Sequence, residues 1–134
     1  MWSRRQRVLR AMKLIGQFRK TALGVDGIAD EWFYVIEGEL EFWVAGQTIA
    51  APAGSFVYGP RGMPHTFIVT STQARFLLVA EPAGFENFMR TLAEPAQARS
   101  LPPAGLGQPP DPARMVAIAA EYGIEILGPP GIPQ

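Results

Sequence analysis

The sequence contains no cysteine and a single histidine, His65. The lack of cysteine excludes disulfides, thiolate metal sites and cysteine nucleophiles, and it suits a reducing compartment, so we expect a cytoplasmic protein. Long apolar runs are missing too. No segment approaches the roughly 18 residues of a membrane span, and charges interrupt the apolar residues near the start, so neither a membrane span nor a secretory signal is expected.

Acidic residues are absent from residues 1–20, which carry seven lysines and arginines. Residues 21–134 hold all twelve acidic residues and only five arginines, a net charge of −7. An acidic body opposes binding to phosphate backbones, so we expect no nucleic-acid partner. The length of 134 residues fits one domain.

What is present is organised in segments. Apolar residues at helical spacing predict an amphipathic helix over residues 3–20, within a basic N-terminal segment 1–23, and Gly24–Ala29 reads as a loop. The apolar period then becomes two, which predicts a barrel over residues 24–83 with strands at residues 32–37, 40–45, 48–51, 55–58, 66–70 and 74–80. Six short strands separated by turn residues indicate an antiparallel barrel or sandwich.

Two helices are expected after the barrel. Residues 84–93 predict a short helix, and residues 94–110, with five prolines, predict a linker. Asp111 and Pro112 predict a helix start in segment 111–134, with a tail from Gly128. The first strand is apolar on both faces, so its outer face needs a cover, which another sheet, a helix or a second subunit could supply. In the last case, a homodimer would form through Trp32, Tyr34 and Trp43.

Two spacings carry the chemistry. Gly54, Pro60 and Gly62 precede His65 at offsets that describe a strand, a tight turn and a new strand, and Glu31 precedes Gly38 by seven residues. With these spacings the chain resembles the cupin superfamily over roughly residues 30–128, and within it the small single-domain cupins similar to quercetin dioxygenase. The resemblance implies an antiparallel jelly-roll barrel that binds a divalent metal on three histidines and one glutamate.

The resemblance assigns the glutamate to Glu31 and one histidine to His65. A carboxylate and a neutral imidazole suit iron, nickel, manganese or zinc, with open positions for substrate or dioxygen. Five apolar residues are candidates for both core and pocket lining: Phe33, Val35, Phe42, Phe67 and Leu77. An inward Glu31 without a metal is expected to be protonated or paired with an arginine such as Arg75.

The first motif is incomplete. The family's His-x-His pair maps to Gly24 and Asp26 or to Val25 and Gly27, so only Asp26 is available as a third ligand, and two ligands rarely hold a metal tightly. The strands that usually precede this pair are missing from the pattern. Three explanations fit: residues 1–29 are not the natural sequence, a partner subunit supplies the strands, or the chain is a decayed copy. We favour the first or the third.

We therefore expect a cupin descended from metal-dependent dioxygenases that act on small organic molecules, with a weakened or lost metal site and no assigned catalytic residue. The alternative is a metal-free module that binds a small organic molecule or dimerises without catalysis. The substrate and the metal are not identifiable from these residues.

Overall fold

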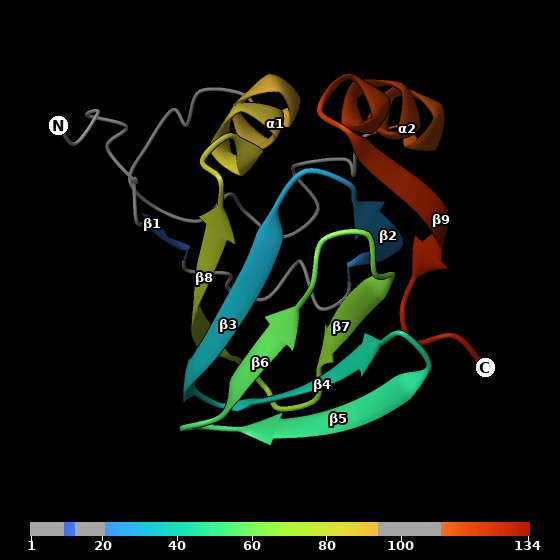
Figure 1. The fold of residues 1–134 in the computed structure, drawn as a ribbon. Coiled ribbons are helices and arrows are strands. Elements are labelled where there is room, and N and C mark those ends of the chain that lie inside the picture. Colours follow the sequence, from blue (N-terminus) through green and yellow to red (C-terminus); the bar gives the residue numbers. More distant parts are fainter. Residues whose placement is uncertain (1–9, 13–20, 94–110) are drawn as a thin grey trace, which may run out of the picture.

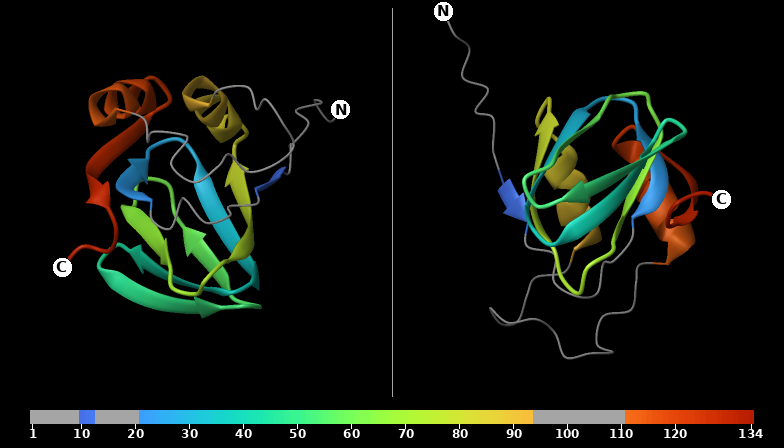
Figure 2. Two further views of the ribbon diagram at one scale, coloured as in Figure 1. Left: turned by 180° about the vertical axis from the view of Figure 1, so that it is seen from behind. Right: turned by 90° about the horizontal axis from the view of Figure 1, so that it is seen from below.

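The protein is described by a computed structural model that covers residues 10–12, 21–93 and 111–134. Two antiparallel sheets face each other and form a barrel, and two helices lie together at one end of this barrel (Figure 1). The view from below shows the strands wrapped around a common interior (Figure 2).

The first sheet has the strand order β1-β8-β3-β6 and the second has the order β5-β4-β7-β2-β9. The strands are β1 (Arg10–Met12), β2 (Ala22–Asp26), β3 (Asp30–Glu37), β4 (Glu39–Val44), β5 (Gln47–Pro52), β6 (Phe56–Gly59), β7 (His65–Val69), β8 (Arg75–Glu81) and β9 (Ile124–Pro130). The helices are α1 (Phe85–Leu92) and α2 (Pro112–Glu121).

The six strands predicted from the period of two are confirmed as β3 to β8, each within two residues of its predicted ends. Gly38, between β3 and β4, has a φ of 77°. A Cβ atom there would lie 2.2 Å from the backbone oxygen of Gln73. Only glycine fits this turn, because it combines left-handed backbone with a close approach of a second chain segment.

Three predictions at the two ends of the chain are wrong. Arg10–Met12 form a strand paired with β8, whereas a helix was expected there; the rest of the predicted helix lies outside the described residues, as does the predicted linker 94–110. The expected loop at 24–29 is replaced in part by β2. The expected tail from Gly128 is partly strand, because β9 pairs with β2 along its whole length.

The interior between the sheets is filled by side chains. Four phenylalanine rings pack together there, with centroid separations of 4.9 Å for Phe33 and Phe42 and 5.2 Å for Phe67 and Phe76. The remaining buried members of this barrel cluster are aliphatic: Val35, Leu40, Ala51, Val57 and Ala74. Tilted and edge-to-face ring contacts of this kind add to the free energy gained from burying apolar area.

The two helices form a second cluster with β9. Phe88 of α1, Ala119 of α2 and Ile124 of β9 are its buried members. The predicted start of α2 is confirmed, because the Asp111 carboxylate accepts a hydrogen bond from the Arg114 backbone N–H at 3.1 Å. Among the described residues, no helix is long and apolar enough to cross a membrane.

Candidate functional site

Glu31 and His65 form a pair inside the barrel. The Glu31 Oε2 and the His65 Nε2 lie 2.5 Å apart, and the two side chains are only 7% and 12% exposed. Glu31 comes from β3 and His65 is the first residue of β7, so each sheet supplies one partner. The sequence pattern singled out both residues, and the fold brings them into direct contact.

A glycine makes room for this contact. Gly59 of β6 is the register partner of Glu31, and a Cβ atom on it would lie 3.3 Å from the His65 ring. A larger residue at position 59 would press on the imidazole, so glycine leaves the room that the pair needs.

The hydrogen bonds around His65 define its protons. Its Nδ1 faces the Met63 backbone carbonyl at 3.1 Å, and its Nε2 faces the Glu31 carboxylate. A carbonyl oxygen only accepts, so Nδ1 carries a proton. A second proton is then held between Nε2 and the carboxylate. Burial lowers the pKa of His65, but the hydrogen bond and negative charge of Glu31 outweigh it, and the pKa lies above the ordinary value of 6.5.

Asp26, the third expected ligand, is occupied elsewhere. It is buried, and its Oδ1 accepts hydrogen bonds from the backbone N–H groups of Ile28 at 2.8 Å and Ala29 at 2.7 Å. These bonds cap the turn between β2 and β3, as aspartate side chains often do. The structure therefore brings Glu31 and His65 together but does not bring Asp26 into the same cluster.

The donor set does not fit a resident metal. Two ligand atoms bound to one metal at about 2.0–2.2 Å lie roughly 3 Å or more apart, so the 2.5 Å separation of Glu31 and His65 is that of a hydrogen bond. Among the described residues, no three histidine, cysteine, aspartate or glutamate side chains gather in one place. The remaining stretches of sequence contain only one residue of these types, Glu94. A metal would also have to displace the proton held by the pair.

The structure shows what surrounds one of the positions at which the family carries a histidine. Gly24 of β2, one of the positions that map to the family's His-x-His pair, is the register partner of His65. A Cβ atom on Gly24 would lie 3.2 Å from the Glu125 backbone oxygen and 3.7 Å from the Ile126 side chain. β9 therefore crowds this position, and a histidine there would need β9 to shift.

Four of the five expected lining residues fill the barrel: Phe33, Val35, Phe42 and Phe67 belong to the barrel cluster. Leu77 does not belong to it, because it follows the buried Phe76 on β8 and so lies on the opposite face of the strand, where it is half-buried. A cavity of about 160 Å³ at the helical end is lined by other residues. The expected role of these five residues in ligand binding stays a prediction.

Sequence reasoning missed a second pair beside the first. Asp30, the neighbour of Glu31, accepts hydrogen bonds from the Arg61 side chain at 2.7 Å and from the Tyr58 hydroxyl at 2.9 Å. Its pKa falls from 3.8 to about 2, mainly through the hydrogen bonds of Arg61. Arg75, the arginine expected near Glu31, instead pairs with Glu37 at 2.6 Å on the surface. The only sequence signal for the Asp30 pair is the alternation of β3, which places Asp30 on the opposite face from Glu31.

Two facing antiparallel sheets that direct a carboxylate and an imidazole into their interior define a β-barrel of the jelly-roll class. Comparison with known families is specific: residues 27–80 match the model of the cupin domain. Over 72 residues the chain is 33% identical to quercetin 2,3-dioxygenase from Bacillus subtilis, an alignment that covers 54% of this chain and 21% of that enzyme. Residues 27–80 are therefore similar to the cupin domain, and the chain resembles quercetin dioxygenase over about half of its own length, so the expected resemblance is confirmed. The expected all-β fold is confirmed by the two antiparallel sheets.

Solved structures with similar folds include KdgF from Halomonas sp., at 15% identity over 52% of this chain and 66% of that chain, with a TM-score of 0.47. The EutQ protein of Clostridium difficile is 31% identical over 48% of each chain, with a TM-score of 0.41.

Proposed function

We propose that this chain is a metal-independent cupin module that binds a small organic molecule and does not act as an oxygenase. The observation that carries the proposal is the 2.5 Å contact between Glu31 and His65. The two residues that match the metal ligands of the family satisfy each other, and they hold a proton where a metal would need two free lone pairs.

The packing of the barrel supports the same proposal. Dioxygen chemistry at a metal needs fixed ligands and open positions for both reactants. Here the phenylalanine rings of the barrel cluster occupy the interior next to the pair, with Phe33 lying 6.2 Å from the His65 ring between centroids. The interior is therefore a packed core around Glu31 and His65, which are hydrogen-bonded to each other and are called the closed pair below.

The first test is the metal content of protein purified without chelators, measured by elemental analysis, together with oxygen consumption in the presence of a flavonol. We expect well under one iron, nickel, manganese or zinc per chain and no metal-dependent oxygen consumption. The control is His65→Ala, which should leave the trace metal content unchanged. One metal per chain that is lost in His65→Ala would overturn the proposal and favour the oxygenase.

A homodimer is a second candidate, because aromatic side chains gather on the outer face of the first sheet. Tyr34 and Tyr58 are each 45% exposed and Phe56 is 64% exposed. Trp32 stacks on Tyr58, with 5.4 Å between centroids. We propose that this face, called the aromatic face, binds a second copy. Trp43, which was expected to contribute, lies on β4 of the other sheet.

The dimer is tested by analytical ultracentrifugation of Tyr34→Lys, which should dissociate it because the charge would be buried without a partner. Thr48→Lys is the matched control: Thr48 is exposed on β5, in the other sheet. A wild-type chain that is monomeric at all concentrations would contradict the proposal. The cytoplasmic location and the absence of a nucleic-acid partner stay predictions from the sequence.

A further inference from the structure

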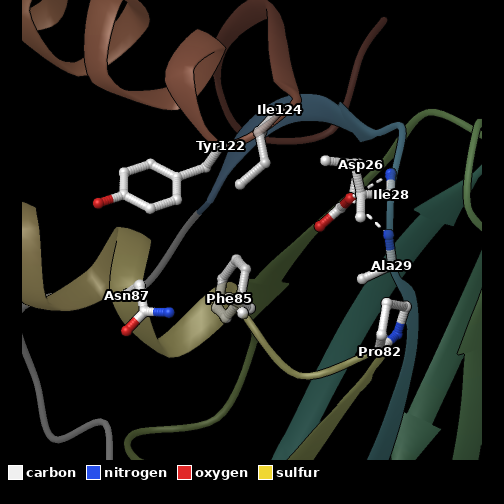
Figure 3. Close-up of a pocket in the computed structure, with 9 residues that line it drawn as sticks. Asp26, Ile28, Ala29, Pro82, Phe85, Asn87, Tyr122 and Ile124 are labelled. Atoms are coloured by element: carbon white, nitrogen blue, oxygen red, sulfur yellow. Dashed lines mark hydrogen bonds between the residues drawn. The ribbon is translucent and has the colours of Figure 1, made fainter.

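A cavity of about 160 Å³ lies between the barrel and the two helices. Its lining comes from the end of β2 and the turn after it, the segment between β8 and α1 with the first turn of α1, and the residue after α2 with the start of β9 (Figure 3). The lining residues are Asp26, Ile28, Ala29, Pro82, Gly84, Phe85, Asn87, Tyr122 and Ile124. Neither Glu31 nor His65 is among them, so this cavity is distinct from the closed pair.

Of the described residues that line the cavity, Asp26 is the only charged one. The residue is 7% exposed, and its Oδ1 is occupied by the backbone N–H groups of Ile28 and Ala29. The second carboxylate oxygen points into the space between Phe85 and Ile124 (Figure 3). Within the described part of the chain, this oxygen accepts no hydrogen bond. No buried side-chain oxygen or nitrogen of the described residues lacks a hydrogen-bond partner, so this oxygen is in contact with solvent, where a donor group of a ligand can reach it.

Apart from the polar Asn87, the rest of the described lining is apolar or aromatic. Phe85 and Tyr122 supply two rings, and Ile28 remains 53% exposed at the edge of the cavity. Glu86, next to Phe85, accepts the Gly84 backbone N–H at 2.9 Å and so adds negative charge at the start of α1. An anionic oxygen among aromatic rings attracts a cation that carries its own apolar surface.

We propose that this cavity binds a small organic ammonium ion, with the ammonium group on the free oxygen of Asp26 and the hydrocarbon part between Phe85, Tyr122 and Ile124. The volume sets the size of the ligand, because a cavity of roughly 150 Å³ admits a molecule the size of benzene. The inference deepens the proposed function by naming the ligand class and the place where it binds.

The test is a titration of the full chain with benzylammonium, followed by ¹H–¹⁵N NMR and calorimetry, with neutral benzyl alcohol as the isosteric comparison. We expect chemical-shift changes centred on Ala29, Phe85 and Ile124. Benzyl alcohol should bind about tenfold more weakly, because it loses the charge-assisted hydrogen bond. Equal binding of the two probes, or no binding of benzylammonium at millimolar concentration, would overturn the proposal.

Two variants separate the carboxylate from the turn that it caps. Asp26→Asn keeps an oxygen for the N–H groups of Ile28 and Ala29 but removes the charge, so benzylammonium should bind about tenfold more weakly. Asp30→Asn removes the same charge four residues away and should leave binding unchanged. If Asp26→Asn does not fold, Phe85→Leu tests the aromatic wall and should weaken binding severalfold. Unchanged binding in Asp26→Asn, or in Phe85→Leu where that variant is needed, would contradict the site.

The metal content of the same samples distinguishes the two proposals. Protein that holds one metal per chain and still binds benzylammonium would overturn the metal-independent function but keep this site. Metal-free protein that does not bind benzylammonium would overturn this site alone.

Discussion

Asp30 and Glu31 are neighbours on one strand, and each carboxylate pairs with a cationic side chain, yet one pair lies at the surface and the other lies inside the barrel. Asp30 meets Arg61 on the surface, where the Arg61 side chain is 53% exposed. Glu31 meets His65 inside the barrel, where both side chains are nearly inaccessible. Because successive residues of a strand face opposite sides, one step along β3 moves an acid from solvent to the core. The surface ion pair therefore contributes little to the free energy of unfolding, whereas removing one partner of the interior pair lowers it by much more.

The largest expected effect comes from breaking the interior pair. His65→Ala leaves the Glu31 carboxylate buried without a partner and should lower the free energy of unfolding by about 3 kcal/mol near neutral pH. Urea denaturation followed by circular dichroism measures the change. Arg61→Ala, the equivalent change in the surface pair, should cost much less. Equal losses in the two variants would remove the distinction between the pairs.

The second effect is the pH dependence of the interior pair. The pKa of His65 in the folded chain is raised above 6.5, so its protonated form is favoured by folding. Its contribution to stability is therefore fully present below the unfolded pKa and is lost as the pH rises through the folded pKa. Urea midpoints between about pH 5 and about pH 9 should show this loss.

The control for this titration is Glu31→Gln. This variant removes the charge that raises the pKa of His65 and leaves burial to lower it. An NMR titration of the imidazole should then give a pKa below that of the wild-type chain. A His65 pKa that does not change in Glu31→Gln would show that another group holds the proton.

The third effect concerns the surface pair and runs in the opposite pH direction. The pKa of Asp30 is lowered to about 2, so its contribution is present above the ordinary value of 3.8 and is lost as the pH falls through about 2. Arg61→Ala should return the pKa of Asp30 toward 3.8, as followed by carboxyl ¹³C NMR. A value that stays near 2 would assign the shift to other groups.

The smallest effect is that of Tyr58→Phe. The change removes the hydroxyl that donates to Asp30 at 2.9 Å but keeps the ring that stacks on Trp32. The pKa of Asp30 should rise, and by less than in Arg61→Ala, because the hydrogen bonds of Arg61 are the larger cause of the shift. A larger rise in Tyr58→Phe than in Arg61→Ala would reverse this order.

The central strands were predictable because each has an alternating apolar face and a glycine or proline turn at its end, as at Gly38 and Gly54. β2 and β9 were not predictable, because these two strands lack such signals. β2 contains Gly24, and β9 ends in Gly128 and two prolines, so its membership of the sheet rests on pairing with β2 rather than on its own composition.

The site was predictable in its residues but not in its geometry. The motif spacing singled out Glu31 and His65, and the fold joins them. The sequence could not show that the two side chains bond to each other, since that depends on the close approach allowed by Gly59 across the barrel. Nor could it show that Asp26 caps a turn, or that α1 and β9 enclose a cavity beside it, because those contacts join distant segments.

The most direct test of the central claim is ¹⁵N NMR of the His65 imidazole near neutral pH, before and after addition of one equivalent of Zn²⁺. The account predicts that Nδ1 carries its proton, that Nε2 shares a proton with Glu31, and that neither signal changes when zinc is added. A loss of the proton at Nε2, with the shift of a metal-bound nitrogen, would contradict the closed pair and restore His65 as a metal ligand.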